Sequence, residues 1–336
     1  MSRIVVVTGG AGFIGSHIVR ALLARGDRVR VLDDLSTGRR ENLADVTADL
    51  EFVEGDVRDE DLAGCVLAGA DSVIHQAALP SVALSFERPG LVESVNVAGT
   101  ATVLGAARRQ GVRRLLLASS CAVYGDAAAV PVTEATPAAP LSPYAVGKLA
   151  AEWHLWVLGA NGGQGEPHSP SREAGAAAPS PGVETVALRY FNVFGPRQDP
   201  GSEYSGVIAR FMSAACAGRP CIIHGDGLQS RDFVYVADVV AANLLALDAA
   251  PAVGSVMNIG SGEETTLLNL VAAIGAAAGI DLRVVYDTAR EGDIRRSVAS
   301  VSLAASLLGY RSQTPLRDGL AHTLDWYRAD VEGSRG

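Results

Sequence analysis

The chain has 336 residues, of which 48% are hydrophobic, and a formal net charge of −9. This length suits one large domain or two fused domains with a sizeable core. The charged residues are spread along the chain without a basic run, which argues against a nucleic-acid partner. No apolar run approaches the roughly 20 residues that a membrane span needs, so no membrane partner is expected.

The N-terminal segment and the cysteines indicate a cytoplasmic location. The chain enters an apolar, strand-like run at Ile4 without a signal-peptide pattern. The four cysteines lack the spacing of a disulfide framework and are expected to be reduced thiols. The six histidines form no ligand motif, so no metal site is expected.

Short β-branched runs alternate with longer helical patterns through the first half of the chain. The expected strands are 3–7, 28–32, 50–56, 71–78, 114–120 and 185–191, and the expected helices are 15–26, 93–110 and 143–158. This alternation predicts an α/β fold with a doubly wound parallel sheet, the Rossmann arrangement. The strands are apolar almost throughout, as a sheet covered on both faces requires.

Beyond Asn192 the pattern is more mixed. Helices are expected at 206–218 and 237–250, strands at 220–225, 231–236 and 256–260, and short helices with one strand from Ser261 onward. We expect a dinucleotide-binding domain at 1–191 and a smaller mixed α/β substrate domain at 192–336, with strands near 233–260 returning to the first. Residues 159–182 are rich in Gly, Pro, Ala and Ser, which predicts a flexible surface insertion.

Three glycines, Gly9, Gly12 and Gly15, lie between the first strand and the first helix. Glycine permits a tight turn and a close approach of the backbone to a pyrophosphate, and the helix N-terminus offers N–H groups to the anion. Such a triplet alone is weak evidence. Its position between a strand and a helix makes it a strong indication of a dinucleotide site.

An acidic residue is expected about 20 residues further on, and Asp33 stands there at the carboxyl end of the second strand. A carboxylate can accept hydrogen bonds from both adenosine ribose hydroxyls, and it would repel a 2′-phosphate. NAD is therefore expected rather than NADP. Asp34 is expected to cap the following turn, and Asp56 with Val57 suits an adenine contact.

The segment "LSPYAVGKLAAE" contains Tyr144 and Lys148, which share a helix face if the helix begins near Pro143. A nearby buried ammonium could lower the pKa of the tyrosine from about 10 to about 7 and make it a general base. In isolation this spacing arises often by chance. The segment "SSCAVYG" follows the fifth strand, however, and would place Ser120 in the ligand crevice beside Tyr144.

Together these motifs resemble an extended short-chain dehydrogenase/reductase close to the nucleotide-sugar 4-epimerases. The resemblance covers nearly the whole chain except 159–182. It is carried by "TGGAGFIG", "HQAA", "SSCAVYG", "YAVGK", "LRYFNVFGPRQDP", "SRDFVYVADVV" and "REGD". It implies that Ser120, Tyr144 and Lys148 form the catalytic set, with NAD as cofactor and a UDP-sugar as substrate.

The resemblance also implies two sets of binding residues. The cofactor set comprises Gly9, Gly12, Phe13, Ile14, Gly15, Asp33, Asp34, Ser36, Thr37, Gly38, Asp56, Val57, Gln76, Ala77, Ala78, Asn96, Ala118, Tyr144, Lys148, Tyr190 and Val193. The substrate set comprises Pro80, Ser120, Cys121, Tyr144, Asn192, Gln198, Gly206, Val207, His224, Arg231, Arg290, Asp293 and Ser297.

The substrate set has plainer alternatives. Arg231 and Arg290 could bind a diphosphate in a bidentate manner or form surface salt bridges. His224 stands where family members place a ring near uracil, or it faces solvent at a strand end. Helices 93–110 and 143–158 pair across a dimer axis in this family, so a homodimer is expected.

The residues after Ser120 distinguish between reactions within the family. Related 4,6-dehydratases carry an acid and a base there, typically Asp–Glu, whereas this chain has Cys121 and Ala122. Oxidation at C4 without elimination makes an epimerase. UDP-glucuronate enzymes, either 4-epimerases or decarboxylases, are the nearest alternative. The 4-epimerases among them carry threonine where Asn192 stands and arginine where Asp199 stands. A non-catalytic NAD-binding regulator would be expected to have lost Tyr144 or Lys148.

One position near "REGD" bears on the sugar. In this family a tyrosine there crowds out an N-acetyl group, whereas a small residue leaves room, and the position falls on Ser297. Gly206 would widen the same region. The expected activity is NAD-dependent interconversion of UDP-GlcNAc and UDP-GalNAc, with UDP-Glc and UDP-Gal also accepted. Alternatively, Ser297 is an ordinary exposed turn serine and specificity is set elsewhere.

Overall fold

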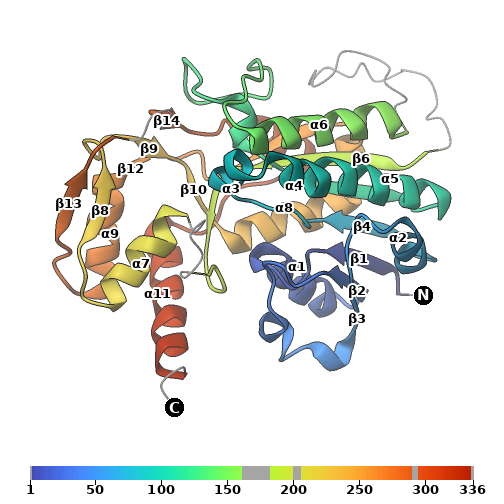
Figure 1. Cartoon of the computed structure of the whole chain (residues 1–336), viewed down its shortest axis with the longest axis horizontal. Helices are drawn as coiled ribbons and strands as arrows, with labels where there is room; N and C mark the ends of the chain where they lie inside the picture. Colours follow the sequence, from blue (N-terminus) through green and yellow to red (C-terminus); the bar gives the residue numbers. More distant parts are fainter. Residues whose placement is uncertain (1, 161–181, 200–205, 290–293, 334–336) are drawn as a thin grey trace.

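The computed structural model describes residues 2–160, 182–199, 206–289 and 294–333. Most of the predicted insertion, together with Arg290 and Asp293, lies outside these ranges. Figure 1 shows two parts, one built around a large sheet and a smaller one that carries α7, α9 and α11.

The large sheet has seven parallel strands in the order β11–β6–β5–β4–β1–β2–β3. In chain order they are β1 (Ile4–Thr8), β2 (Arg28–Asp33), β3 (Leu50–Glu54), β4 (Ser72–His75), β5 (Arg114–Ser120), β6 (Glu184–Tyr190) and β11 (Val256–Ile259). The chain runs outward from β1 to β3 and then crosses back to β4. A crevice therefore opens at the carboxyl ends of β1 and β4, where ligands bind in such sheets. The predicted fold class is confirmed.

Apolar helix faces cover both sides of this sheet. The buried side chains of α1 (Phe13–Ala24), α8 (Val236–Asp248) and α10 (Ser302–Leu308) pack on one side. Those of α2 (Glu60–Leu67), α5 (Thr100–Arg109) and α6 (Pro143–Leu158) pack on the other. Three of these elements, β11, α8 and α10, come from the second half of the chain. If the domains are divided at Asn192, as we propose, the first domain must also include these three later elements.

Local signals fix the helix that carries Tyr144 and Lys148. Ser142 caps α6, since its hydroxyl accepts the Ala145 N–H at 3.2 Å. Pro143 takes the first helical position, where no N–H is needed. The expected helix at 93–110 is observed as α4 (Pro89–Glu93), a π-helical segment (Ser94–Gly99) and α5, with the short α3 (Val82–Glu87) before them.

The smaller part has its own core between α7 (Val207–Cys216), α9 (Leu267–Ala278) and α11 (Leu316–Gly333). Three small sheets accompany it. They pair β7 (Asn192–Phe194) with β10 (Phe233–Tyr235), β8 (Cys221–His224) with β13 (Val284–Asp287), and β9 (Ser230–Arg231) with both β12 (Thr265–Thr266) and β14 (Arg296–Ser297). None of the described helices is long and apolar enough to cross a membrane.

The expectation of one strand and short helices after Ser261 is wrong. Three strands, β12, β13 and β14, follow that residue, and α11 has 18 residues. Two of these strands are only two residues long, and their pairing depends on β9, which a local pattern cannot reveal. The strand expected at 231–236 is interrupted at Asp232, whose carboxylate accepts the N–H groups of Ser261, Gly262 and Ala299.

Candidate active site

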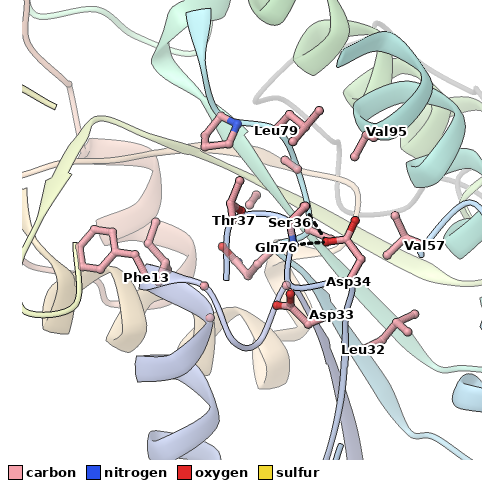
Figure 2. Close-up of a pocket in the computed structure, with 18 of the residues that line it drawn as sticks. Phe13, Leu32, Asp33, Asp34, Ser36, Thr37, Val57, Gln76, Leu79 and Val95 are labelled. Carbon is pink, nitrogen blue, oxygen red and sulfur yellow. Dashed lines mark hydrogen bonds between the residues drawn. The ribbon is translucent and has the colours of Figure 1, made fainter. Parts of the chain in front are cut away.

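A cleft opens at the carboxyl ends of β1, β2, β4 and β5, as the strand order requires (Figure 2). Side chains from the first glycine loop, from the end of β2 and from α6 converge on it. Most of the expected cofactor residues line it, namely Gly9, Gly12, Phe13, Ile14, Gly15, Asp33, Asp34, Ser36, Thr37, Val57, Gln76, Ala77, Ala78, Ala118, Tyr144, Lys148 and Tyr190. Pro80, expected in the substrate set, lies here too.

The glycine loop leaves no room for side chains. Gly9 has a φ of +67°, and a Cβ there would lie 2.7 Å from the Ala77 nitrogen. A Cβ on Gly15 would lie 2.1 Å from the Gly9 carbonyl oxygen. Helix α1 begins at Phe13, and Gly12 before it has no side chain that could accept the first N–H groups of the helix. The first turn of the helix lines the cleft, so these N–H groups are available to an anion there. This cradle fits a dinucleotide pyrophosphate.

Gly15→Ala is therefore expected to force the glycine loop away from α1 and to abolish retention of NAD during purification. The overpacking should also lower stability by about 1–3 kcal/mol. Gly64→Ala in α2 is the matched control, because the nearest atom to its Cβ would be 3.9 Å away. Acid release and quantification of the nucleotide, together with the melting temperature, make the comparison. A Gly15→Ala protein that kept a full complement of NAD would contradict the proposed close approach of the glycine loop to the pyrophosphate.

The adenosine end of the cleft carries a buried carboxylate. Asp33 is 5% exposed, and its two oxygens accept the Ala11 and Leu35 N–H groups, each at 2.9 Å. Burial raises the pKa of this carboxyl. Each oxygen keeps a second lone pair for a ribose hydroxyl. As expected, Asp34 forms the turn, since it accepts the Ser36 N–H at 3.0 Å and its hydroxyl at 2.6 Å (Figure 2).

Two arginines follow this loop and could in principle attract a 2′-phosphate. Arg39 forms an ion pair with Asp199 at 2.6 Å, and Arg40 forms one with Glu54 at 2.6 Å. Carboxylates thus neutralise both guanidinium groups. The adenosine end therefore suits NAD, in agreement with the sequence analysis.

Four expected cofactor residues do not line the cleft. Asn96 is 2% exposed and holds the loop after β4 from behind, since its amide bonds the Leu79 N–H and carbonyl at 2.8 and 3.1 Å. Asp56 forms an ion pair with Arg58, Gly38 packs on Ala11, and Val193 packs against the core. Conversely, the expected set omitted Leu32, Gly55, Leu79, Val95 and Ser119, which line the cleft. Each of them adjoins a residue of the expected set, a signal that could have identified them.

The expected catalytic side chains meet at the inner end of the cleft. Tyr144 and Lys148 are both buried, and Lys148 Nζ lies 5.9 Å from the centre of the tyrosine ring. Lys148 Nζ donates a hydrogen bond to the Ala118 carbonyl at 2.9 Å. The Ser120 side chain lies close enough to Tyr144 to lower the pKa of the tyrosine, and the Ser120 hydroxyl accepts the Ala122 N–H at 3.2 Å.

In the protein by itself, Lys148 does not bring the pKa of Tyr144 near neutrality. Burial raises the pKa of Tyr144 to about 12, although the nearby Ser120 side chain acts in the opposite direction. Burial also lowers the pKa of Lys148 to about 8, against the effect of Glu152. The lysine therefore faces a desolvation penalty of its own, and it bonds a carbonyl rather than the phenol.

A second cavity lies in the smaller part and gathers expected substrate residues. Asn192, Val207, His224 and Arg231 line it, together with Arg210, Ile222, Gln229 and Leu267, which the sequence analysis did not identify. No motif pointed to Arg210, whose place depends on how α7 packs. Gln198 and Gly206 lie near each other, since a Cβ on Gly206 would be 3.4 Å from Gln198 Nε2.

Cys121 and Ser297 bring this region close to Ser120. Strand β14 pairs Ser297 with Arg231 on β9, and the Ser297 side chain lies close enough to the Cys121 thiol to affect the pKa of that thiol. Ser297 is 8% exposed, so it is not an exposed turn serine. Burial raises the pKa of Cys121 to about 11, which keeps the thiol neutral. Neither Cys121 nor Ala122 supplies a carboxylate next to the catalytic hydroxyl.

Comparison with known proteins agrees with this geometry. The model of the NAD dependent epimerase/dehydratase family matches residues 5–260. A UDP-glucose 4-epimerase from Mycolicibacterium smegmatis is 40% identical over 327 residues, which are 96% of this chain and 98% of that protein. A dTDP-glucose 4,6-dehydratase from an Actinoplanes species is 36% identical over 97% of this chain and 98% of its own length.

Solved structures give the same result. UDP-glucose 4-epimerase from Thermotoga maritima, with UDP-glucose, has a TM-score of 0.87 and 34% identity, and the match covers 98% of this chain and 99% of that one. UDP-N-acetylglucosamine 4-epimerase from Methanobrevibacter ruminantium, in complex with UDP-N-acetylmuramic acid, has a TM-score of 0.88 and 34% identity with the same coverage. The chain belongs to the NAD-dependent epimerase/dehydratase family, and its full-length homologues include UDP-sugar 4-epimerases. Its cofactor is NAD, as the family and the cleft both require.

Proposed function

We propose that the protein interconverts the C4 epimers of a UDP-hexose through a transient 4-keto sugar. One observation carries the proposal: Tyr144 lies beside Lys148 in the cofactor cleft, with Ser120 close enough to affect its pKa, while Cys121 and Ala122 replace the acid–base pair of a dehydratase. Such a site can move the C4 hydroxyl proton but has no carboxylate there to drive elimination. Incubation with a panel of UDP-sugars, with the products identified by NMR, tests this proposal.

In this proposal, some residues transfer the proton and others bind the UDP end of the substrate. Tyr144 takes the C4 hydroxyl proton with Ser120 as a bridge, and it later returns the proton. When bound, NAD would supply the hydride acceptor and donor for C4, and the positive charge of its oxidised ring would favour the Tyr144 phenolate. Asn192 and Arg231 hold the UDP end in the second cavity while the keto sugar turns over.

The substrate pair that we propose is UDP-GlcNAc and UDP-GalNAc, with UDP-Glc and UDP-Gal also accepted. Supporting this, Ser297 is buried beside Arg231 and Cys121, where a bulky residue would narrow the space for a C2 substituent. A relative at 34% identity is named for N-acetylglucosamine, whereas the Mycolicibacterium relative is named for glucose.

A UDP-glucuronate 4-epimerase or decarboxylase is the second candidate. An aspartate at position 199 would repel the carboxylate of a hexuronate, which argues against this candidate. Asp199, however, forms an ion pair with Arg39, so its charge is partly neutralised and its repulsion is weaker than expected. Asn192 still stands where such 4-epimerases carry threonine. The same panel decides, since UDP-glucuronate would then be the preferred substrate.

We also propose that the protein is a cytoplasmic homodimer. Its four cysteines are free thiols. Large apolar side chains remain exposed on α3 and α6, among them Phe86 (62%), Val146 (53%) and Val157 (50%). The spacing of Val146, Trp153 and Val157 places them along one face of α6, as a helix-to-helix contact requires.

Val146→Glu should therefore dissociate the dimer, because a charge would be buried against the partner's apolar surface. Ile280→Glu, at an equally apolar exposed position away from α3 and α6, should leave association unchanged. Sedimentation velocity gives the molar mass of each variant. A monomeric unaltered protein, or a dimer that survives Val146→Glu, would contradict the proposal.

A further inference from the structure

Beneath the catalytic set lies a fully buried ion pair. Glu152 on α6 and Arg189 on β6 have side-chain exposures of 0% and 1%. Their contact is bidentate, with Arg189 Nε 2.9 Å from Glu152 Oε1 and Nη2 2.7 Å from Oε2. Burying such a pair requires removing two charges from water, and a pair of apolar residues would often serve stability equally well. Stability alone therefore gives little reason for this pair.

Glu152 also joins the two elements that carry the reacting groups. Its Oε1 accepts the hydroxyl proton of Ser119, the neighbour of Ser120 at the end of β5. The last three residues of β5 each contact α6, and the three helix positions are spaced one turn apart. Ser120 lies close enough to Tyr144 to lower its pKa, the Ala118 carbonyl accepts a hydrogen bond from Lys148, and Ser119 donates one to Glu152.

Arg189 anchors this arrangement from the far side. Its guanidinium carbon lies 4.7 Å from the centre of the Tyr124 ring. The Tyr124 hydroxyl in turn donates to Asn258 at 2.7 Å. Glu152 is thus held between β5, α6 and β6, so its carboxylate cannot move without moving the end of β5 that bears Ser120.

We propose that Glu152 is a positioning residue, which fixes Ser119 and Ser120 against Tyr144 and serves as the counter-charge of the Lys148 ammonium. The inference rests on the proposed function, because it assumes that Tyr144, Ser120 and Lys148 carry out the proton transfer. Glu152 itself does not touch the reacting atoms; it acts through its neighbours.

The groups facing Lys148 set the sign of the expected pH effect. On α6 they are Tyr144 and Glu152, and on β5 the Ala118 carbonyl. On β4, His75 is held between Thr8 and Thr100, and burial together with Lys148 lowers its pKa to about 3, so it is neutral. Glu152 raises the pKa of Lys148, whereas burial lowers it to about 8. Removing the carboxylate charge should make the ammonium lose its proton at lower pH.

Glu152→Gln keeps the shape but removes the charge, and we expect kcat to fall at least tenfold. The alkaline limb of the kcat profile should move to lower pH by roughly one unit. Because an unpaired Arg189 charge can prevent folding, the double variant Glu152→Gln/Arg189→Met is measured as well. Ser119→Ala keeps the Glu152 charge and removes the hydrogen bond between β5 and Glu152. It should therefore lower kcat without moving the alkaline limb of the kcat profile.

Glu184→Gln is the matched control, because it breaks another glutamate–arginine pair on β6, with Arg114, away from the cleft. It should leave both kcat and the alkaline limb of the kcat profile unchanged. Every variant should keep its bound NAD. If the unaltered protein epimerises a UDP-sugar and both Glu152 variants keep its pH profile, the inference is overturned. If the unaltered protein epimerises no UDP-sugar, the proposed function fails instead.

Discussion

Tyr144→Phe is expected to lower the rate of epimerisation by about 100- to 10,000-fold, the range over which a positioned acid–base group contributes. The ring would still fill its buried place, but no hydroxyl would remain to exchange a proton with C4. The variant should keep its NAD, because the glycine cradle and Asp33 are untouched. Turnover is measured with saturating UDP-GalNAc and no added cofactor.

Tyr286→Phe makes the same change at an exposed tyrosine, 58% accessible, and should behave as the unaltered protein. Ser120→Ala should show a smaller loss than Tyr144→Phe, since water can replace a bridging hydroxyl. A Tyr144→Phe enzyme with a near-native rate would show that another group takes the proton.

Ser297→Tyr is expected to suppress kcat/KM for UDP-GalNAc by about 10- to 100-fold relative to UDP-Gal, because overpacking penalises only the substrate that carries the extra group. Ser297 is 8% exposed and lies beside Cys121, so we expect a larger side chain to occupy the space proposed for the C2 substituent of the sugar. Parallel steady-state kinetics with the two substrates give this ratio.

Ser297→Ala also removes the hydroxyl but adds no volume, and it should keep both activities. It therefore separates the effect of a larger side chain from the effect of losing the serine hydroxyl. A melting temperature shows whether the tyrosine variant is folded. An unaltered enzyme that turns over UDP-Gal but not UDP-GalNAc would contradict the proposed role of Ser297 in leaving room for the N-acetyl group. Equal losses on both substrates in a folded Ser297→Tyr protein would contradict it as well.

Local pattern was sufficient for the elements that hold the cofactor. Asp33 follows an apolar strand, and the glycine loop separates a strand from a helix, so their positions follow from short-range rules. Helix α6 has the predicted bounds because Ser142, Pro143 and Gly159 are all local signals. A strand order with β11 at the edge depends instead on which segments pair across some 70 residues.

The direction of a polar side chain was harder to predict. Asn96 is a polar residue in the right region, yet its amide holds the Leu79 backbone instead of facing the cleft. Helical spacing likewise shows that Lys148 shares a helix face with Tyr144, but not that its ammonium donates a hydrogen bond to the Ala118 carbonyl. Glu152 and Arg189 are 37 residues apart, and nothing local indicates that they meet.

The fate of a deuterium label at C4 of the sugar tests the proposed reaction most directly. UDP-[4-²H]GalNAc is incubated with the purified protein and no added cofactor, and the product is followed by ¹H NMR. An epimerase that works through Tyr144 and bound NAD gives UDP-GlcNAc with the label still at C4, and the same final mixture arises from either epimer. A 4-keto-6-deoxy sugar, loss of the label to solvent, or a requirement for stoichiometric NAD would contradict the proposed reaction.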